Sequence, residues 1–334
     1  MAAAARVQGD ARVSERSGLS DVDLALLAVL DDIGARAHGP HVKSSRVLDE
    51  LHHATGIPPR YGYEVMCDLA APWLVNLRLV DPHGNFGSPD FGAANPRYTE
   101  ARLSDIGMLA VAAERHGGPP VPVGMINGDI HLDGRRPALD PTRLTDTLAA
   151  LAQDHAMTDE EIIASVGPPA FPTRCRVDGD LAALAGGDPV RLTLRARLVW
   201  EQRPTPSGGR TELVISCLPP TTSVSEIAQL IKQRVEQAHW HARHPELAHE
   251  VQLPIRDVVD ETTSDDGRST RLVIIPKADV DPASLEAQLD EIWGIKVEVN
   301  AQLGAPLAEM LRSWIERFPR SDVIDGLTQL RALL

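Results

Sequence analysis

The chain has 334 residues, of which 43% are apolar and 24% charged, a length and composition that suit two globular domains with sizeable cores. Its net charge of −14 argues against a protein that coats DNA by overall positive charge, although a local cationic groove is still compatible with that total. The three cysteines have no metal-ligand spacing, and no apolar run reaches the roughly 18 residues of a membrane span. We therefore expect a cytoplasmic protein without a disulfide framework, a zinc site or membrane contact.

The first part of the chain predicts a mainly helical unit over residues 18–118. Residues 1–17 are small and polar and are expected to be disordered. Apolar residues at helical spacing from Val22 to Ile33 predict an amphipathic helix, with Ser20 and Asp21 as candidate caps. The other elements expected in this unit are helices over 45–54, 63–71 and 103–114, a strand over 74–80, a turn over 81–85 and a Gly-Gly-Pro-Pro break at 117–120.

The second part predicts a mixed α/β unit over residues 119–305, which makes the fold class α+β. Strands are expected over 121–131, 191–200, 212–217 and 271–275, with a turn at 204–209 that joins the second and third into a hairpin. Helices are expected over 140–152, 159–166, 223–238 and 282–293. Residues 306–334 should form a last helix over 306–317 and a short tail.

The most distinctive stretch is a turn-rich loop followed by an Arg-Tyr pair. Residues 79–88 read LVDPHGNFGS and residues 97–102 read RYTEAR, so Tyr98 follows Arg97 directly. A phenol is a poor nucleophile at neutral pH because its pKa is about 10, but an adjacent guanidinium favours the phenolate and can hold a phosphate oxygen. Tyr98 is therefore a candidate for covalent attack on a phosphodiester; the alternative is an ordinary half-buried tyrosine. Residues 84–87 should form a tight turn that fixes the tyrosine loop.

This stretch resembles the active-site region of the A subunits of DNA gyrase and topoisomerase IV, the bacterial type IIA topoisomerases. Residues 43–47 (KSSRV), 123–125 (VGM), 171–173 (FPT) and 260–274 resemble that family's KSARVVG, GIAVGM, FPTGG and RDESD-x-DG-x-RIVIE segments, in the same order. The matches extend over residues 18–318. The resemblance implies a winged-helix DNA-cleavage domain over 18–118 and a tower domain over 119–305.

The resemblance also implies roles for individual residues. Tyr98 would attack a DNA backbone phosphate to form a transient 5′-phosphotyrosyl link, and Arg97 would stabilise the charge on that phosphate.

Four further residues would contact DNA. Lys43, Ser45 and Arg46 would contact phosphates at the start of a recognition helix, the alternative being a solvated helix start. Val121 stands where the family inserts an isoleucine wedge between base steps; a core residue of a strand is the alternative.

Partners and cofactors follow from what the sequence lacks. It contains neither a phosphate-binding G-x-x-x-x-G-K-[ST] loop nor the paired acids of a TOPRIM module. The resemblance therefore implies double-stranded DNA as the substrate, a B-type subunit with TOPRIM and GHKL ATPase domains that holds Mg²⁺, and an A2B2 complex built on a homodimer. The family's A subunits continue into a coiled coil, a C-terminal gate and, in gyrase, a pinwheel. This sequence stops at Leu334, so a truncated form is expected.

The departures from the family support a second hypothesis. Where the family carries HPHGDSAVYD, residues 55–64 read TGIPPRYGYE, so both histidines are missing. Its VHRR becomes VDLA at residues 22–25, which removes two cations. These losses favour a catalytically impaired mimic of the DNA gate that binds or regulates a B subunit. The third hypothesis is a structural DNA-binding protein, which the net charge supports poorly. Residues 239–244 (HWHARH) have metal-like spacing, but no cysteine or acid completes a site, so no metal site is predicted.

Overall fold

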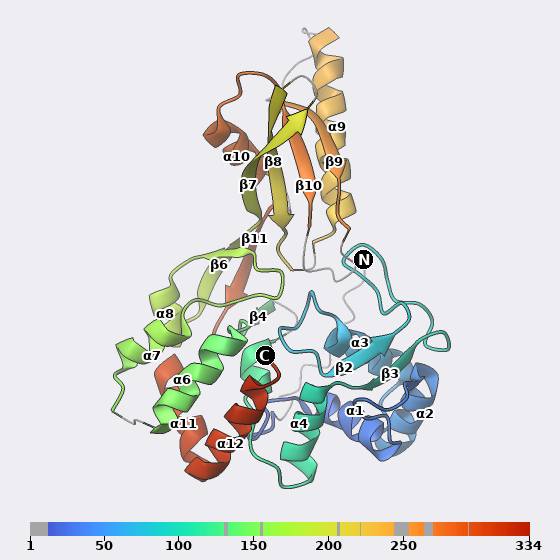
Figure 1. Ribbon diagram of the computed structural model, residues 1–334, viewed down its shortest axis with the longest axis vertical. Coiled ribbons are helices and arrows are strands. Elements are labelled where there is room, and N and C mark those ends of the chain that lie inside the picture. Colours follow the sequence, from blue (N-terminus) through green and yellow to red (C-terminus); the bar gives the residue numbers. More distant parts are fainter. Residues whose placement is uncertain are drawn as a thin grey trace.

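A broad base carries a narrower unit that projects from it (Figure 1). The computed structural model describes residues 13–129, 133–153, 156–205, 208–220, 222–243, 254–263, 270–292 and 294–334. The base has one large hydrophobic core, which runs from Leu19 to Leu330 in sequence. The projecting unit has a second core, formed between residues 196 and 295.

The N-terminal part of the base consists of four helices and a small antiparallel sheet in the order β1–β3–β2. Ser20 caps the first helix as expected, because its hydroxyl accepts from the Asp23 N–H and the Asp23 carboxylate accepts from the Ser20 N–H. The helices bury apolar faces against one another, with Leu26, Leu51 and Met66 fully buried in the shared core. The elements are α1 (Asp21–Asp32), β1 (Val42–Lys43), α2 (Ser44–Thr55), α3 (Pro59–Ala70), β2 (Val80–His83), β3 (Glu100–Leu103) and α4 (Asp105–Arg115).

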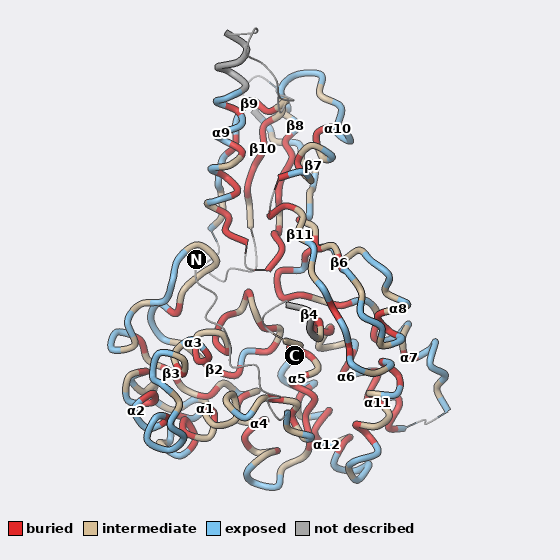
Figure 2. Tube along the Cα trace, turned by 180° about the vertical axis from the view of Figure 1, so that it is seen from behind, coloured by how far each residue is buried: buried red, intermediate tan, exposed pale blue. Residues whose placement is uncertain are grey.

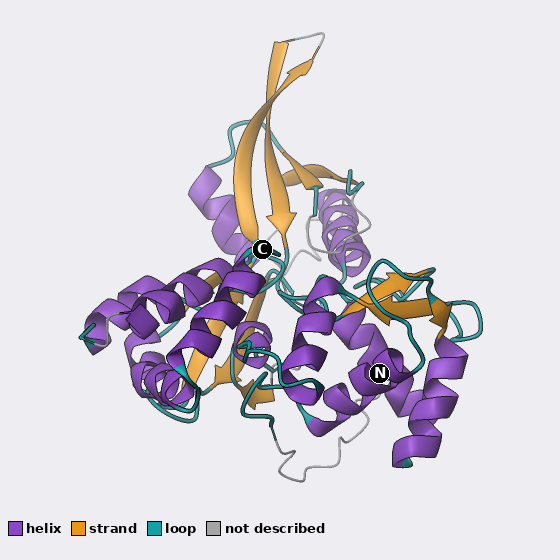
Figure 3. Cartoon of the chain, turned by 60° about the horizontal axis from the view of Figure 1, so that its bottom comes forward, coloured by secondary structure: helices purple, strands orange, loops and turns teal. Residues whose placement is uncertain are grey.

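The rest of the base is mixed. A sheet in the order β4–β11–β6–β5 lies with the helices α6, α7, α11 and α12, whose apolar residues belong to the same core as α1–α4 (Figures 1 and 3). The elements are α5 (Val123–Asn127), β4 (Asp133–Arg135), α6 (Pro141–Gln153), α7 (Asp159–Val166), β5 (Arg176–Asp178), α8 (Leu181–Ala185), β6 (Val190–Arg195), β11 (Lys296–Ala301), α11 (Leu307–Glu316) and α12 (Arg320–Arg331).

The projecting unit is an antiparallel sheet in the order β7–β8–β10–β9, with the helices α9 and α10 packed on it. Figure 2 shows buried chain along the sides of α9 and the sheet that face each other. Residues that alternate along the strands supply this core, such as Leu213 and Ile274, and they pack with Ile227 and Ile231 of α9. The elements are β7 (Arg197–Thr205), β8 (Gly208–Cys217), α9 (Val224–Arg243), β9 (Ile255–Asp260), β10 (Leu272–Pro276) and α10 (Pro282–Asp290).

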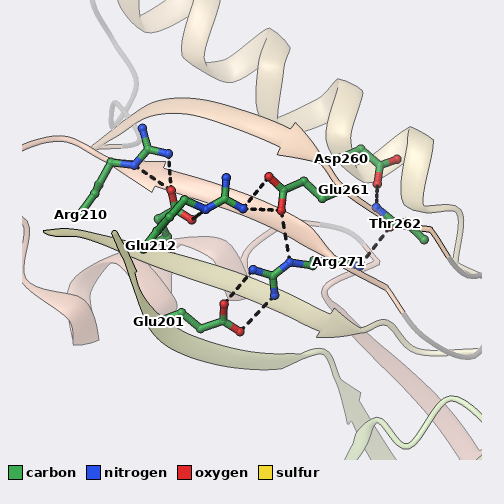
Figure 4. Close-up of polar contacts among 8 residues, drawn as sticks. Glu201, Arg210, Glu212, Asp260, Glu261, Thr262 and Arg271 are labelled. Atoms are coloured by element: carbon green, nitrogen blue, oxygen red, sulfur yellow. Dashed lines mark hydrogen bonds and ion pairs between the residues drawn. The ribbon is translucent and has the colours of Figure 1, made fainter. Parts of the chain in front are cut away.

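An ion-pair network links the strands of this sheet (Figure 4). Glu212 is fully buried, and it is paired with Arg210 and with Nε of Arg203 at 3.1 Å. Glu261 accepts from both Arg203 and Arg271. Arg271 also contacts Glu201, with 2.8 Å between Nη2 and Oε2. Three arginines and three glutamates balance one another here, so these six side chains add no net charge to the unit.

Several predicted elements are confirmed. Helices form close to the expected ranges at α1, α2, α4, α6 and α7, and β7 and β8 form the expected hairpin, although residues 206–207 at its tip lie outside the described residues. The expected helices at 63–71, 223–238 and 282–293 also form, but α3 begins earlier, α9 extends further and α10 ends earlier.

Other predictions are wrong. Residues 74–79 are turns rather than a strand, and 121–131 contains the short helix α5, in which Val123 and Ile126 face the core at helical spacing. The expected strand over 191–200 is two strands in different sheets, separated at Ala196, whose N–H donates to the Ile295 carbonyl. The expected C-terminal tail is the helix α12, because Val323, Leu327 and Leu330 are buried.

Residues 13–17 correct the expected disorder of residues 1–17, of which 1–12 lie outside the described part of the chain. Ser17 is fully buried, and its N–H donates to Oε1 of Glu114 at 2.9 Å. The Arg16 guanidinium donates to the Gly118 carbonyl at 2.8 Å. This segment is therefore part of the base. The core also runs across residue 118, where we expected a domain boundary.

Candidate functional site at Tyr98

Tyr98 stands on the surface, just before β3. Its side chain is 71% exposed, although a phenol ring is usually at least half-buried in a folded protein. A tight turn presents it: the Tyr98 N–H donates to the Asn95 carbonyl at 2.8 Å, and the Arg97 N–H donates to the Asn95 side chain at 3.2 Å. Neither the Arg97 guanidinium nor the Tyr98 hydroxyl has a hydrogen-bond or ion-pair partner among the described residues. Both groups are therefore free to meet a ligand.

The expected turn at residues 84–87 lies directly under the tyrosine. Gly84 has φ +94°, and a Cβ there would stand 3.2 Å from the Tyr98 carbonyl oxygen. Gly87 has φ +98°, and its N–H donates to the Asn85 side chain at 2.8 Å. Glycine is required at both positions because other residues rarely adopt a positive φ. The turn thus supports the backbone of the tyrosine loop.

A buried set of hydroxyl groups holds the other side of the loop. Thr99 is fully buried, and its hydroxyl donates to Oγ of Ser44 at 2.9 Å. The Tyr63 hydroxyl lies 3.0 Å from the Thr99 oxygen and donates to the Ala94 carbonyl at 2.7 Å. Burial raises the pKa of Tyr63, although its hydrogen bond with Thr99 opposes the shift, so Tyr63 stays a neutral donor. The sequence did not predict these hydrogen bonds between Tyr63, Thr99 and Ser44. The one indication was that Tyr63 lies on the side of its helix that packs against the core.

The start of α2 is fastened to the tyrosine loop through the backbone. The Ser44 N–H donates to the Thr99 carbonyl at 3.0 Å, and the Ser45 N–H donates to the Pro96 carbonyl at 3.2 Å. Lys43 Nζ lies 2.8 Å from Oε1 of Glu100, and this hydrogen bond lowers the pKa of Glu100.

Three of the predicted DNA contacts therefore lie at the same end of one helix, next to the loop. Lys43 and Arg46 are exposed and Ser45 is half-buried, and Arg46 has no ion pair within the described part of the chain. The structure thus gathers these residues beside Arg97 and Tyr98, which belong to a segment about 50 positions later.

Val121 does not lie on the surface, where a residue that inserts between base steps would have to be. Its side chain is 0% exposed and belongs to the core of the base, so it has no surface to insert between base steps. Residues 16–18 run across it: the Val121 N–H donates to the Arg16 carbonyl at 3.0 Å, and a Cβ on Gly124 would stand 2.0 Å from the Gly18 carbonyl oxygen. Val121 is a core residue, as the alternative held, but in a loop rather than in a strand.

The described residues do not suggest a cysteine nucleophile or a metal site near Tyr98. Burial raises the pKa of Cys67 to about 12, so its thiol stays protonated and is no nucleophile. Within the described ranges, no group of three or more histidine, cysteine, aspartate or glutamate side chains could hold a metal ion. The metal-like segment at 239–244 lies partly outside those ranges. No described helix is long and apolar enough to cross a membrane.

Comparison with known proteins identifies relatives along most of the chain, although no family model matches it. The chain is 28% identical over 345 residues to the DNA gyrase A subunit of Granulibacter bethesdensis, which covers 92% of this chain and 34% of that protein. It is 25% identical over 355 residues to that of Pseudomonas aeruginosa, covering 94% and 36%, and 27% identical over 368 residues to that of Aminobacterium colombiense, covering 97% and 42%. The chain thus spans 34% to 42% of the length of these relatives.

Proposed function

We propose that this gyrase A-like chain is the DNA-cleaving A-type subunit of a type IIA topoisomerase, with double-stranded DNA as its substrate. The observation that carries the proposal is the exposed Arg97–Tyr98 pair, held against a helix start that bears Lys43 and Arg46. In this proposal α1–α4 with the β1–β3–β2 sheet are the winged-helix domain, and the projecting unit belongs to the tower.

The proposed reaction is a reversible transfer of a phosphodiester. Oη of Tyr98 attacks a backbone phosphorus and loses its proton, the bond from phosphorus to the 3′ oxygen breaks, and the 3′ oxygen takes up a proton. The 5′ side of the break is then linked to Tyr98. Because the new bond is also a phosphodiester, attack by the 3′-hydroxyl restores the strand without an external energy source. Arg97 donates charge-assisted hydrogen bonds to the phosphate oxygens as their charge rises.

Cations from both segments assist in holding the backbone. Lys43 and Arg46 lie where the loop meets α2, so a phosphate next to the one attacked would find positive charge there. Glu100 offsets part of the Lys43 charge, which makes Arg46 and Arg97 the principal free cations of the site.

Magnesium in this proposal comes from a partner. Glu100 is the acid closest in sequence to Tyr98, and it is already paired with Lys43. Since the described residues offer no cluster of metal ligands, they do not fit a magnesium site of their own. The proposed partner is a B-type subunit with TOPRIM and GHKL ATPase domains, in an A2B2 complex whose two A-type chains cut one strand each.

Trapping of the covalent intermediate tests the proposal. The chain is mixed with a B-type subunit, Mg²⁺ and plasmid DNA, and detergent is added to expose covalent protein–DNA adducts. We expect adducts with the wild type, none with Tyr98→Phe, and about 10²-fold fewer with Arg97→Ala, as for loss of one charge-stabilising donor. Tyr61→Phe is the matched control, because the Tyr61 hydroxyl has no hydrogen-bond partner among the described residues. Adducts that persist in Tyr98→Phe would show that another residue attacks.

A second candidate is the gate mimic that binds a B subunit without cutting. The buried Val121 and the net charge of −14 favour it, since the chain then has no wedge and little overall attraction for DNA. A wild-type chain that binds a B subunit tightly, inhibits its complex with a cleaving A-type subunit, and forms no adduct of its own would support this candidate over the first.

A further inference from the structure

The loop that carries Tyr98 is tied to the projecting unit through one carboxylate. Oδ1 of Asp90 accepts from the backbone N–H of Ser225 at 3.0 Å and from the Ser225 hydroxyl at 2.9 Å. It also accepts from the hydroxyl of Ser223. Ser223 in turn accepts from the Glu226 N–H at 3.0 Å, as an N-cap does. The start of α9 is therefore capped partly by Ser223 and partly by Asp90, which lies 133 positions before Ser223 in the chain.

Asp90 is itself fixed within a small turn. The Ser88 hydroxyl accepts from the N–H groups of Asp90 at 3.2 Å and Phe91 at 3.1 Å, and the Ser88 N–H donates to the Phe91 carbonyl at 2.8 Å. The next tie along the chain is the Ala94 N–H, which donates to the Asn85 carbonyl at 3.0 Å. Short-range hydrogen bonds thus hold Asp90 in its own turn and close the loop at Ala94, one residue before the turn that presents Tyr98.

Apolar packing does little to place this loop. Between residues 87 and 98 every described side chain is exposed or half-buried, and Phe91 is 73% exposed. A segment with few buried contacts takes its position from its polar ties. All hydrogen bonds between the described residues of the loop and the projecting unit are made by Asp90.

The charge of Asp90 suits this role. A helix N-terminus carries a partial positive charge and unpaired N–H groups, which favour a carboxylate. Burial raises the pKa of Asp90, but the hydrogen bonds from Ser223 and Ser225 outweigh that effect, so the pKa lies below its ordinary value. The carboxylate is thus ionised, and accepts these bonds, throughout the neutral range.

We propose that Asp90 is a positioning residue, which fixes the tyrosine loop to the start of α9 so that the placement of Tyr98 for attack depends on the projecting unit. The inference rests on the proposed function. The loop then joins α9, through Asp90, to the start of α2, through Pro96 and Thr99, so a tilt of α9 would strain the segment that carries Tyr98 between these two attachments. Misplacement by about 1 Å can cost roughly 10²-fold in rate.

Hydrogen exchange on the full chain tests the tie without needing activity. We expect Asp90→Ala to speed exchange at Ala94, Tyr98 and the first turn of α9 by about tenfold, and Asp90→Asn, which keeps an acceptor oxygen, to restore part of the protection. The matched control is Asp281→Ala. It removes an equivalent cap from α10 in the same unit, where Asp281 accepts from the Ser284 N–H at 2.8 Å, and it should leave the tyrosine loop unchanged.

Adduct formation with a B-type subunit then tests the positioning. Asp90→Ala should slow the adduct by about 10- to 100-fold at unchanged affinity for DNA, Asp90→Asn should be intermediate, and Asp281→Ala should match the wild type. Wild-type exchange in the loop of Asp90→Ala, or faster exchange with an unchanged rate of cleavage, would overturn the inference while leaving the proposed function intact. A wild-type chain that forms no adduct would instead remove the proposed function, and the role of Asp90 in attack would go with it.

Discussion

Removing the Tyr63 hydroxyl should loosen the support of the candidate nucleophile by a calculable amount. Tyr63→Phe deletes one oxygen and keeps the ring, whose centroid lies 6.2 Å from that of Phe86. The Ala94 carbonyl then loses its donor, and the Thr99 hydroxyl loses a neighbour at 3.0 Å. Since Thr99 is fully buried, water cannot readily replace the missing group. Leaving such a partner unsatisfied costs about 1–2 kcal/mol, which corresponds to roughly a 5- to 30-fold increase in local opening.

Amide hydrogen exchange measures this effect where it should occur. The amides of Ser44 and Ser45 donate to carbonyls of the loop, and the Tyr98 amide closes the turn that presents the phenol. We expect all three to exchange roughly 5- to 30-fold faster in Tyr63→Phe, with helices of the projecting unit unaffected. Tyr61→Phe, on the same helix but without a hydrogen bond from its hydroxyl to the described residues, should exchange like the wild type. Equal exchange in both variants would refute the supporting role of Tyr63.

Three further predictions concern stability, pH and DNA contact. Gly326→Ala should destabilise the chain by about 1–3 kcal/mol in denaturant unfolding despite the higher helix propensity of alanine, because its Cβ would stand 2.1 Å from the Pro120 carbonyl oxygen. Asp31→Asn should cost about 1–2 kcal/mol at pH 7, a figure discounted because the partners of this buried carboxylate, among them His116 at 3.0 Å, are partly exposed. Phe91→Ala should weaken DNA binding by the proposed complex by about 1–3 kcal/mol in a titration, because its exposed ring would be buried against the duplex.

The pH dependence of the Asp31 prediction has a definite sign. Burial raises the pKa of Asp31, but hydrogen bonds from His116 and Arg36 outweigh it, so the folded pKa lies below the unfolded value of about 3.9. The stability that wild type gains over Asp31→Asn is thus fully present above about pH 4 and is lost as the pH falls through the folded pKa. A difference that instead grew as the pH fell below about 4 would contradict this sign.

Each of the three has a control that separates the stated cause from a general effect. Thr328→Ala changes an exposed position of α12 and should be neutral or slightly stabilising. Asp32, the neighbour of Asp31, has a side chain that is 60% exposed. Asp32→Asn should therefore lower the free energy of unfolding by less than half as much as Asp31→Asn. Leu333→Ala removes an exposed apolar side chain far from Tyr98 in sequence and should leave DNA affinity unchanged. If Gly326→Ala stabilised the chain, the close contact with Pro120 would not be the cause. If Leu333→Ala and Phe91→Ala lost equal DNA affinity, the Phe91 ring would not be the cause.

Sequence by itself determined the elements whose signals are local. The cap at Ser20, the apolar spacing of α1, the break at residues 117–120 and the β7–β8 hairpin all depend on residues within a few positions of one another. The Arg97–Tyr98 pair and the turn below it are recognisable for the same reason, since their spacing along the chain carries the pattern.

Only the tertiary structure decided what surrounds that pair. Tyr63, Ser44 and Thr99 meet from three segments, and Asp90 meets Ser225 across 135 positions, so no periodicity in the sequence relates them. Burial is equally non-local: the sequence is compatible with Val121 as a strand residue or a wedge, and its burial depends on distant segments, among them residues 16–18. A side chain's type and spacing are written in the sequence, but its exposure and its partners depend on which distant segment packs against it.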